Sequence, residues 1–434
     1  MRKMHMTYPV TKKEENRIKT NKKNLSVFFW SIIFSVFLLL RDSYSLNINK
    51  YIFVMIIILC SVIINPKQLL YLYCFLFPLY VGLPGNYMTL IFLFRLIFEY
   101  KKMHFKITST FFAAAISIFI FLQNYITGYM SITNMMFIPG VILVLILFSY
   151  QVNLCRKSII LFYSLGVAVL GLIMLISTLQ VYEFSSLLSV SFRLGTSSVD
   201  YVSSNVMNVS IDPNFYGLFV IAAIATGIPL VRSKAMLRTD KMLLLSALII
   251  STTVGLVGLS RAFMLVLAIW MLLYLLIQKR IEGFIVVLSA IIIGTVLLFK
   301  FMPVVMNTII DRFKDSDMAT ANNRLPIIQE YFELWSKNLF FILFGTGLFS
   351  NNVHNMPLQF LFGGGIILFA LMLGFTISLT RHESRLNFTM EKWLPMIVTL
   401  AMVSTVPAAG LLNFMFPVII VGLNQKILNN ELSK

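Results

Sequence analysis

Residues 242–278, MLLLSALIISTTVGLVGLSRAFMLVLAIWMLLYLLIQ, decide the fold class of this chain. The only charged residue in this stretch is Arg261, and it divides the stretch into two apolar runs. Each run approaches the roughly 20 residues that an α-helix needs to cross the hydrocarbon core of a bilayer. Similar runs recur along the chain. They predict a polytopic α-helical bundle, because helices satisfy their backbone polar groups internally in lipid.

The composition supports this prediction. The chain has 434 residues, of which 59% are hydrophobic and 12% charged, and this apolar content exceeds that of water-soluble domains. An outer-membrane barrel is excluded, because it would show short alternating strands instead of continuous apolar runs. The formal charge of +18 does not indicate nucleic acid as a partner, since the basic residues are scattered in short connections between apolar runs.

The apolar runs predict about 12–14 membrane-spanning helices. Their expected boundaries are 25–40, 46–64, 68–84, 87–99, 108–126, 132–150, 158–180, 214–231, 242–259, 262–278, 283–301, 355–379, 393–410 and 411–428. Residues 1–24 are expected to form a basic cytoplasmic tail, and residues 25–434 a single transmembrane domain.

The basic residues predict the orientation. With the N-terminus in the cytoplasm and every span crossing fully, most of the 35 lysine and arginine residues fall in cytoplasmic segments. This distribution follows the positive-inside rule and places both termini in the cytoplasm. Two long connections, about 181–213 and 302–354, then lie outside. Long ordered loops are usually functional, so the chemistry is expected on the external face.

Two arginines are the first candidates for a site there. An isolated charge in an apolar stretch is costly and points to function, although Arg261 could instead be an interfacial side chain that reaches the headgroups. Arg324 opens the segment RLPIIQEYFELWSKNLFFILFG, whose apolar residues recur at intervals of three and four. This pattern predicts an amphipathic helix on the membrane or over a cavity. Arg324 itself could equally be a solvated loop charge.

His354 and Asn355 follow a glycine-rich turn and precede a span. A histidine there suits a base or a hydrogen-bond donor near neutral pH, or is a satisfied interfacial side chain. Arg193 is a weaker candidate in the first long loop. Asp212-Pro213-Asn214 stands before a span and could be simply a helix-start device, with Asp as cap and Pro in the first turn.

A further candidate feature is the triplet Gly363–Gly365, which would allow close helix packing or a local break. No metal site is predicted, since no second His, Asp or Glu stands one helical turn from His354. Arginines gathered above an apolar bundle suit a lipid diphosphate, because guanidinium forks bind phosphate oxygens bidentately.

At these residues the chain resembles the O-antigen polymerase and O-antigen ligase superfamily of bacterial envelope enzymes. The resemblance covers roughly residues 190–380, and the first half of the chain matches only in hydropathy. It is carried by Ser260-Arg261-Ala262, Arg324 with Trp335, Gly345-Thr346-Gly347, His354-Asn355, Gly363–Gly365 and, from the polymerase side, Asp212-Pro213-Asn214.

The resemblance implies a metal-independent membrane glycosyltransferase without a cofactor. Its donor and acceptor would be undecaprenyl-diphosphate-linked glycans at the outer face of the bacterial inner membrane. Arg261 and Arg324 would hold the diphosphate, and His354 would orient or deprotonate the acceptor hydroxyl. Arg193, Asp212, Asn214 and Asn355 would support the substrate or the loops. The bilayer and a chain-length regulator are the other partners that this resemblance suggests.

Three functions remain open. A polymerase would transfer the growing glycan onto the next lipid-linked repeat unit, whereas a ligase would transfer finished polymer to the lipid A core. The motif Asp212-Pro213-Asn214 favours the polymerase. A flippase or secondary transporter is the third possibility, but transporters place ionisable residues near the bilayer midplane, and here the candidate charges gather at one face.

Overall fold

The fold is all helical in every part of the chain that the computed structural model describes. These parts are residues 12–44, 46–83, 85–128, 132–149, 156–180, 213–232, 236–258, 260–277, 324–347, 355–380 and 390–406, with a few single positions between and after them. The helices are α1 Lys12–Asp42, α2 Lys50–Ile63, α3 Pro66–Leu76, η1 Pro78–Gly82, α4 Gly85–Ile97, η2 Tyr100–Lys102, α5 Ile107–Thr127, α6 Ile132–Met135, α7 Phe137–Ser149, α8 Arg156–Leu179, α10 Pro213–Arg232, α11 Arg238–Val257, α12 Arg261–Ile277, α15 Arg324–Ser336, α16 Leu339–Phe344, α17 Met356–Thr380 and α18 Met390–Val403.

Six of these helices, α1, α5, α8, α10, α11 and α17, are long and apolar enough to cross a membrane. Five shorter apolar helices, α2, α4, α7, α12 and α18, accompany them. The predicted fold class is therefore confirmed, and the chain is an all-α polytopic membrane protein. The predicted spans 283–301 and 411–428 fall almost entirely outside the described residues.

The outer surface of the bundle is apolar, as a surface that faces lipid must be. On α5, Phe111, Ile118 and Ile126 have exposed fractions above 60%, and Leu373 and Ile377 on α17 are also exposed. In water such exposed apolar side chains on long helices would cause aggregation. Against acyl chains they replace one apolar contact with another.

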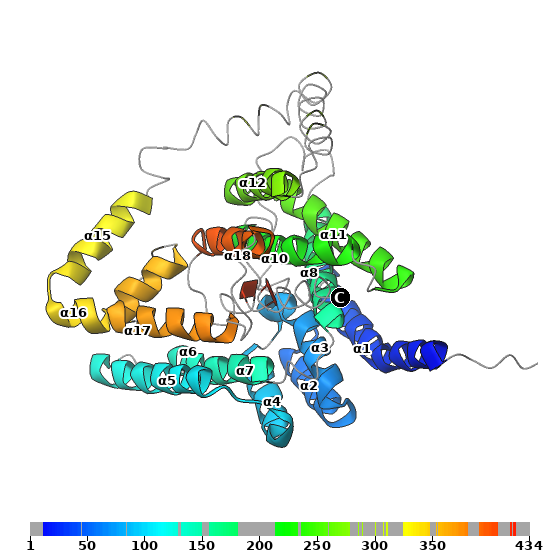
Figure 1. Ribbon diagram of the computed structural model, residues 1–434, viewed down its shortest axis with the longest axis horizontal. Helices are drawn as coiled ribbons and strands as arrows, with labels where there is room; N and C mark the ends of the chain where they lie inside the picture. Colours follow the sequence, from blue (N-terminus) through cyan, green and yellow to red (C-terminus); the bar gives the residue numbers. More distant parts are fainter. Residues whose placement is uncertain are drawn as a thin grey trace, which may run out of the picture.

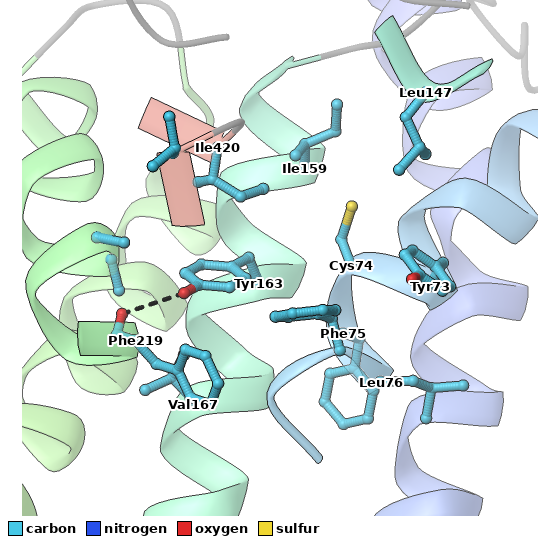
Figure 2. Close-up of a cluster of buried hydrophobic side chains, with 14 of the residues drawn as sticks. Tyr73, Cys74, Phe75, Leu76, Leu147, Ile159, Tyr163, Val167, Phe219 and Ile420 are labelled. Carbon is cyan, nitrogen blue, oxygen red and sulfur yellow. Dashed lines mark hydrogen bonds between the residues drawn. The ribbon is translucent and has the colours of Figure 1, made fainter. Parts of the chain in front are cut away.

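The centre of the bundle is built from α3, α8 and α10, with α11 against α8 and α10 (Figure 1). Figure 2 shows the apolar contact zone, in which Phe75 and Cys74 of α3 face α8. The hydroxyl of Tyr163 on α8 donates a hydrogen bond to the carbonyl oxygen of Phe219 on α10, at 3.3 Å. This bond lets a buried tyrosine satisfy its polar atom inside an apolar core.

Prolines divide two of the predicted spans. The span expected at 68–84 is α-helical only to Leu76 and continues from Pro78 as the 3₁₀ helix η1. In the span expected at 132–150, a turn at Met136 separates α6 from α7. Pro139 explains this turn, because its ring would clash with the carbonyl group of Met135 in a continuous helix.

Hydrogen bonds between helix ends agree with the predicted alternation of the spans. Each bond joins two ends that the sequence places on the same side of the membrane. The pairs are Ser177 with Asp42, Ser260 with Asn214, Arg232 with Tyr274, Arg95 with Ser61 and His104 with Ser149. Arg95, in the last turn of the apolar helix α4, also pairs with Glu99 at 3.4 Å, so this charge has a partner one helical turn later.

The helices form two groups. In the first, α10 packs against α8, α11, α12 and α18. In the second, α17 packs against α5 and α16, and α15 lies on α16 and α17. Helices α4 and α7 connect the groups. Helix α4 contacts α7 and also α3, which packs against α8 of the first group, and α7 contacts α5 of the second. Figure 1 shows the second group at the left, with α15 and α16 at its edge and α12 well separated from them.

Candidate functional site

The candidate site is the place where α10 and α12 begin side by side. The Ser260 hydroxyl donates to the Asn214 side-chain oxygen, at 2.6 Å. The same hydroxyl accepts the backbone N–H of Phe263 at 3.2 Å, so Ser260 caps the first turn of α12. Pro213 begins α10, where its missing N–H removes no helical hydrogen bond. Two segments far apart in sequence are thus joined at one point.

The electrostatics of this point favour an anion. Arg261 is the first residue of α12 and is half-buried. The N-termini of α10 and α12 each contribute a partial positive charge. Helix starts of this kind bind phosphate and carboxylate groups. A guanidinium beside two helix starts adds a full positive charge that persists at every physiological pH.

Close packing fixes the two helix starts relative to each other. Phe263 on α12 is fully buried, and its side chain lies against Gly217 on α10 and Gly255 on α11. A methyl group on either glycine would overlap the phenylalanine ring or its Cβ. Tight packing of α10, α11 and α12 around Phe263 therefore fixes the backbone at Arg261, two residues earlier in α12.

Arg324 lies in the second helix group. It begins α15, which forms where the sequence predicts a helix, and it is half-buried. Ile327, Ile328, Tyr331 and Trp335 are the half-buried residues that share its face, and the Trp335 ring lies 5.7 Å from that of Phe362 on α17. The structure thus places Arg324 at the start of a helix in the group of α17 and Arg261 at the start of a helix in the group of α10, and Figure 1 shows these two helices, α15 and α12, well apart.

The remaining predicted site residues are divided between described and undescribed parts. Asn355 caps α17, because its side-chain oxygen accepts the backbone N–H of Leu358 at 3.1 Å. This role is structural and was not foreseen from the sequence, although an asparagine before an apolar run is a common cap. Arg193, Asp212 and His354 lie outside the described residues.

Gln123, a buried residue near the end of α5, was not among the candidates predicted from the sequence. Its amide nitrogen donates to the carbonyl oxygens of Phe344 and Gly363, the second at 2.7 Å. Gly363 stands just before Gly365, where α17 has a left-handed residue with φ +72° inside the helix. The triplet Gly363–Gly365 therefore marks a helix break, one of the two interpretations that the sequence left open.

No group of three or more His, Cys, Asp or Glu side chains that could hold a metal ion occurs among the described residues. Comparison of the chain with protein-family models, with curated proteins and with solved structures found no match. A function must therefore be argued from the geometry and chemistry of the residues themselves.

Proposed function

We propose that this membrane protein polymerises undecaprenyl-diphosphate-linked oligosaccharide repeat units, of O-antigen or a related surface polysaccharide, at the outer face of the bacterial inner membrane. The observation that carries the proposal is the Ser260–Asn214 hydrogen bond, which joins the starts of α10 and α12 beside Arg261. A positively charged corner at the end of apolar helices suits a ligand with a phosphate head and a hydrocarbon tail.

The chemistry that these residues would support is glycosyl transfer. A hydroxyl of the acceptor glycan attacks the anomeric carbon of the donor, and the bond from that carbon to the diphosphate oxygen breaks. The departing undecaprenyl diphosphate carries the electron pair, and the hydroxyl proton passes to a base. Arg261 and the two helix starts would stabilise the charge that develops on the diphosphate.

Other assignments rest on the sequence resemblance. His354 would be the base, next to the Asn355 cap of α17. Arg324 would be a second diphosphate contact, although its helix belongs to the other group. Arg193, Asp212, Asn214 and Asn355 would support the substrate or the loops. The proposal thus depends most on Arg261, which begins α12 beside the Ser260–Asn214 hydrogen bond.

The test uses purified protein in vesicles of phosphatidylethanolamine and phosphatidylglycerol, supplied with defined lipid-linked repeat units. We expect a ladder of glycan products from the unchanged protein. Arg261→Ala, Arg324→Ala and His354→Ala should each abolish it while the protein still inserts. Arg261→Lys should also fail, since an ammonium cannot replace a bidentate guanidinium. Normal ladders from all three alanine variants would overturn the site assignment.

Arg238→Ala is the matched control. Like Arg261, Arg238 is the first residue of a helix, but it is exposed and begins α11 at the end opposite to Ser260. We expect its ladder to equal that of the unchanged protein. A loss in this variant as large as that in Arg261→Ala would show that helix-start arginines matter for folding or insertion instead of for phosphate binding.

The ligase and the flippase are the alternative functions. A deletion strain whose lipid A core carries a single repeat unit supports the polymerase, whereas full-length polymer left on the lipid carrier supports the ligase. The break in α17 is the observation that favours a transporter, since broken helices are common in that class. Movement of a labelled lipid-linked glycan across vesicles without any glycosyl transfer would support the flippase.

A further inference from the structure

Helix α16 is a short apolar helix on the surface of the second helix group. Its sequence is LFFILF, residues 339–344, without a polar side chain. Leu339 is 69% exposed, Phe340 40% and Phe344 37%. In contrast, the preceding helix α15 exposes Gln329, Glu330 and Glu333 as well as apolar side chains. The polarity of the exposed surface therefore changes abruptly between these two consecutive helices.

The end of α16 is fixed well inside the membrane-spanning part of α17. The backbone N–H groups of Thr346 and Gly347 donate to the carbonyl oxygens of Phe362 and Gly363, each at 3.0 Å. The apolar span of α17 begins at Met356. Phe362 and Gly363 follow it by more than one and a half turns, or about 10 Å along the helix axis. The residues after α16 consequently lie about that far below the start of the span.

The backbone of this segment is satisfied by protein groups, as it must be in hydrocarbon. The break at Gly365 frees carbonyl groups of α17 from their helical partners, and these accept the N–H groups of Thr346 and Gly347. The Gln123 amide of α5 binds both the Phe344 and the Gly363 carbonyl oxygens. An external loop surrounded by water would have no need of a buried amide for its backbone.

The exposed face of α16 continues the apolar face of α5. The rings of Phe344 and Phe119 stack with centroids 6.0 Å apart and planes 10° from parallel. Beside them on α5, Ile118 and Leu122 are 61% and 49% exposed, and Ile366 on α17 is 45% exposed. Figure 1 shows α5, α16 and α17 together at the left of the molecule. The same environment must therefore cover all three helices.

We propose that α16 and residues 345–347 form a re-entrant membrane element whose exposed face contacts lipid acyl chains. The chain leaves the membrane surface near Asn338 and descends through α16 to residues 345–347. The second predicted external loop is then only partly external. This proposal does not depend on which side of the membrane is outside, nor on the glycosyltransferase function.

The experiment places one spin label at a time in a variant whose native cysteines, Cys60, Cys74 and Cys155, are replaced by alanine. The labelled positions are Leu339→Cys and Phe344→Cys, with Ser336→Cys at the end of α15 as the surface control and Leu373→Cys on α17 as the lipid control. Protein in phosphatidylethanolamine–phosphatidylglycerol vesicles is exposed to oxygen, which concentrates in lipid, and to a nickel chelate, which stays in water.

At Phe344 we expect the ratio of oxygen to nickel accessibility to match that at Leu373 and to exceed that at Ser336 severalfold. A ratio at Phe344 equal to that at Ser336 would overturn the proposal. If the Phe344 label prevents folding, the Leu339 label takes its place. Leu339 is exposed at the membrane-surface end of α16, so its ratio should lie between those at Ser336 and Leu373, and a ratio equal to that at Ser336 would overturn the proposal. Loss of polymerase activity with an unchanged ratio would affect only the proposed function.

Discussion

Helices α10 and α17 have similar lengths and apolar sequences but hold their places in different ways. In α10, 78% of the apolar span is buried in the protein, compared with 44% in α17. Protein surrounds α10, and packed side chains such as Tyr216 connect it to α8 and α11. Helix α17 lies at the edge, is broken at Gly365 and is joined to its neighbours through backbone groups.

The difference teaches that burial and backbone hydrogen bonding contribute in different proportions to the two helix positions. Lipid acyl chains contact an apolar helix surface about as favourably as a neighbouring helix does. Apolar contact alone therefore does not determine which helix packs against a peripheral helix. A broken helix has free backbone groups, and lipid cannot satisfy them. The break therefore makes α17 specific for α16 and α5 through its backbone groups, whereas α10 is held by packed side chains and by side-chain hydrogen bonds such as those of Tyr216.

The largest expected effect comes from Gly365→Ala in α17. Gly365 has φ +72°, and a Cβ there would overlap the Leu343 carbonyl oxygen. Left-handed strain and backbone overlap together should cost about 3 kcal/mol or more. The measurement is the folded fraction during titration of bicelle-solubilised protein with dodecyl sulfate.

Gly128→Ala is the control for this change. Gly128 ends α5 with φ +71°, but nothing lies within 4 Å of the position that its Cβ would take. We expect a loss of about 1 kcal/mol from the strain alone. Equal losses at Gly128 and Gly365 would show that the contact with α16 contributes nothing to the place of α17.

Gln123→Leu should have the next largest effect. It removes both amide hydrogen bonds to the Phe344 and Gly363 carbonyl oxygens and replaces the amide with an apolar side chain of similar size. We expect a loss of about 1–2 kcal/mol in the same titration. The control Gln329→Leu, on the exposed surface of α15, should change stability by less than about 0.5 kcal/mol. A loss of stability no greater than that of the control would show that the Gln123 amide does not help to hold α16 and α17 in place.

Ser260→Ala tests the junction of α10 and α12 in the first group. It removes the cap of α12 and the bond to Asn214. We expect a loss of about 1 kcal/mol, the usual effect of removing a helix cap, together with weaker polymer formation. Ser336→Ala on α15, whose hydroxyl bonds only within its own helix turn, is the control. Unchanged stability and activity after Ser260→Ala would show that the Ser260–Asn214 hydrogen bond supports neither the fold nor the proposed site.

The smallest effect is expected from Tyr216→Phe in α10. The Tyr216 hydroxyl lies 3.3 Å from the Val167 carbonyl oxygen and 3.4 Å from that of Ser251. Its removal should cost about 0.5–1 kcal/mol, because the ring, which supplies most of the packing, remains. Tyr125→Phe, at a side chain that is 70% exposed, should have no measurable effect. A loss above that of Gln123→Leu would reverse the proposed contrast between α10 and α17.

Much of the fold could be predicted because run length and hydropathy are local properties. Residues 108–126, 158–180 and 214–231 were predicted as spans, and α5, α8 and α10 cover them closely. Pro78 is likewise a local signal, but the span 68–84 was predicted from the length of its apolar run, so the end of the α-helix before Pro78 was not predicted. Which helices pack against each other is not a local property of the sequence. Gln123 and Gly363 are 240 residues apart, and nothing near either residue indicates the other.

The candidate site could be predicted only in part for the same reason. Ser260 and Asn214 both stand in motifs noted in the sequence, but their contact spans 46 residues and depends on how α10 and α12 pack. The resemblance implies that Arg261 and Arg324 hold one diphosphate, and in the structure these residues begin helices of two different groups. Spacing along a chain does not determine the distance between two helices, because a helix can pack against several different neighbours.

The most direct test of the central claim is binding of undecaprenyl diphosphate, without a glycan, to the purified protein in vesicles. Unchanged protein should bind it, and Arg261→Lys should weaken binding at least about tenfold, the factor for a loss of 1.4 kcal/mol, if the guanidinium holds the diphosphate as a fork. Equal affinity in Arg261→Lys and the unchanged protein would contradict the claim that the corner formed by α10 and α12 is a diphosphate site.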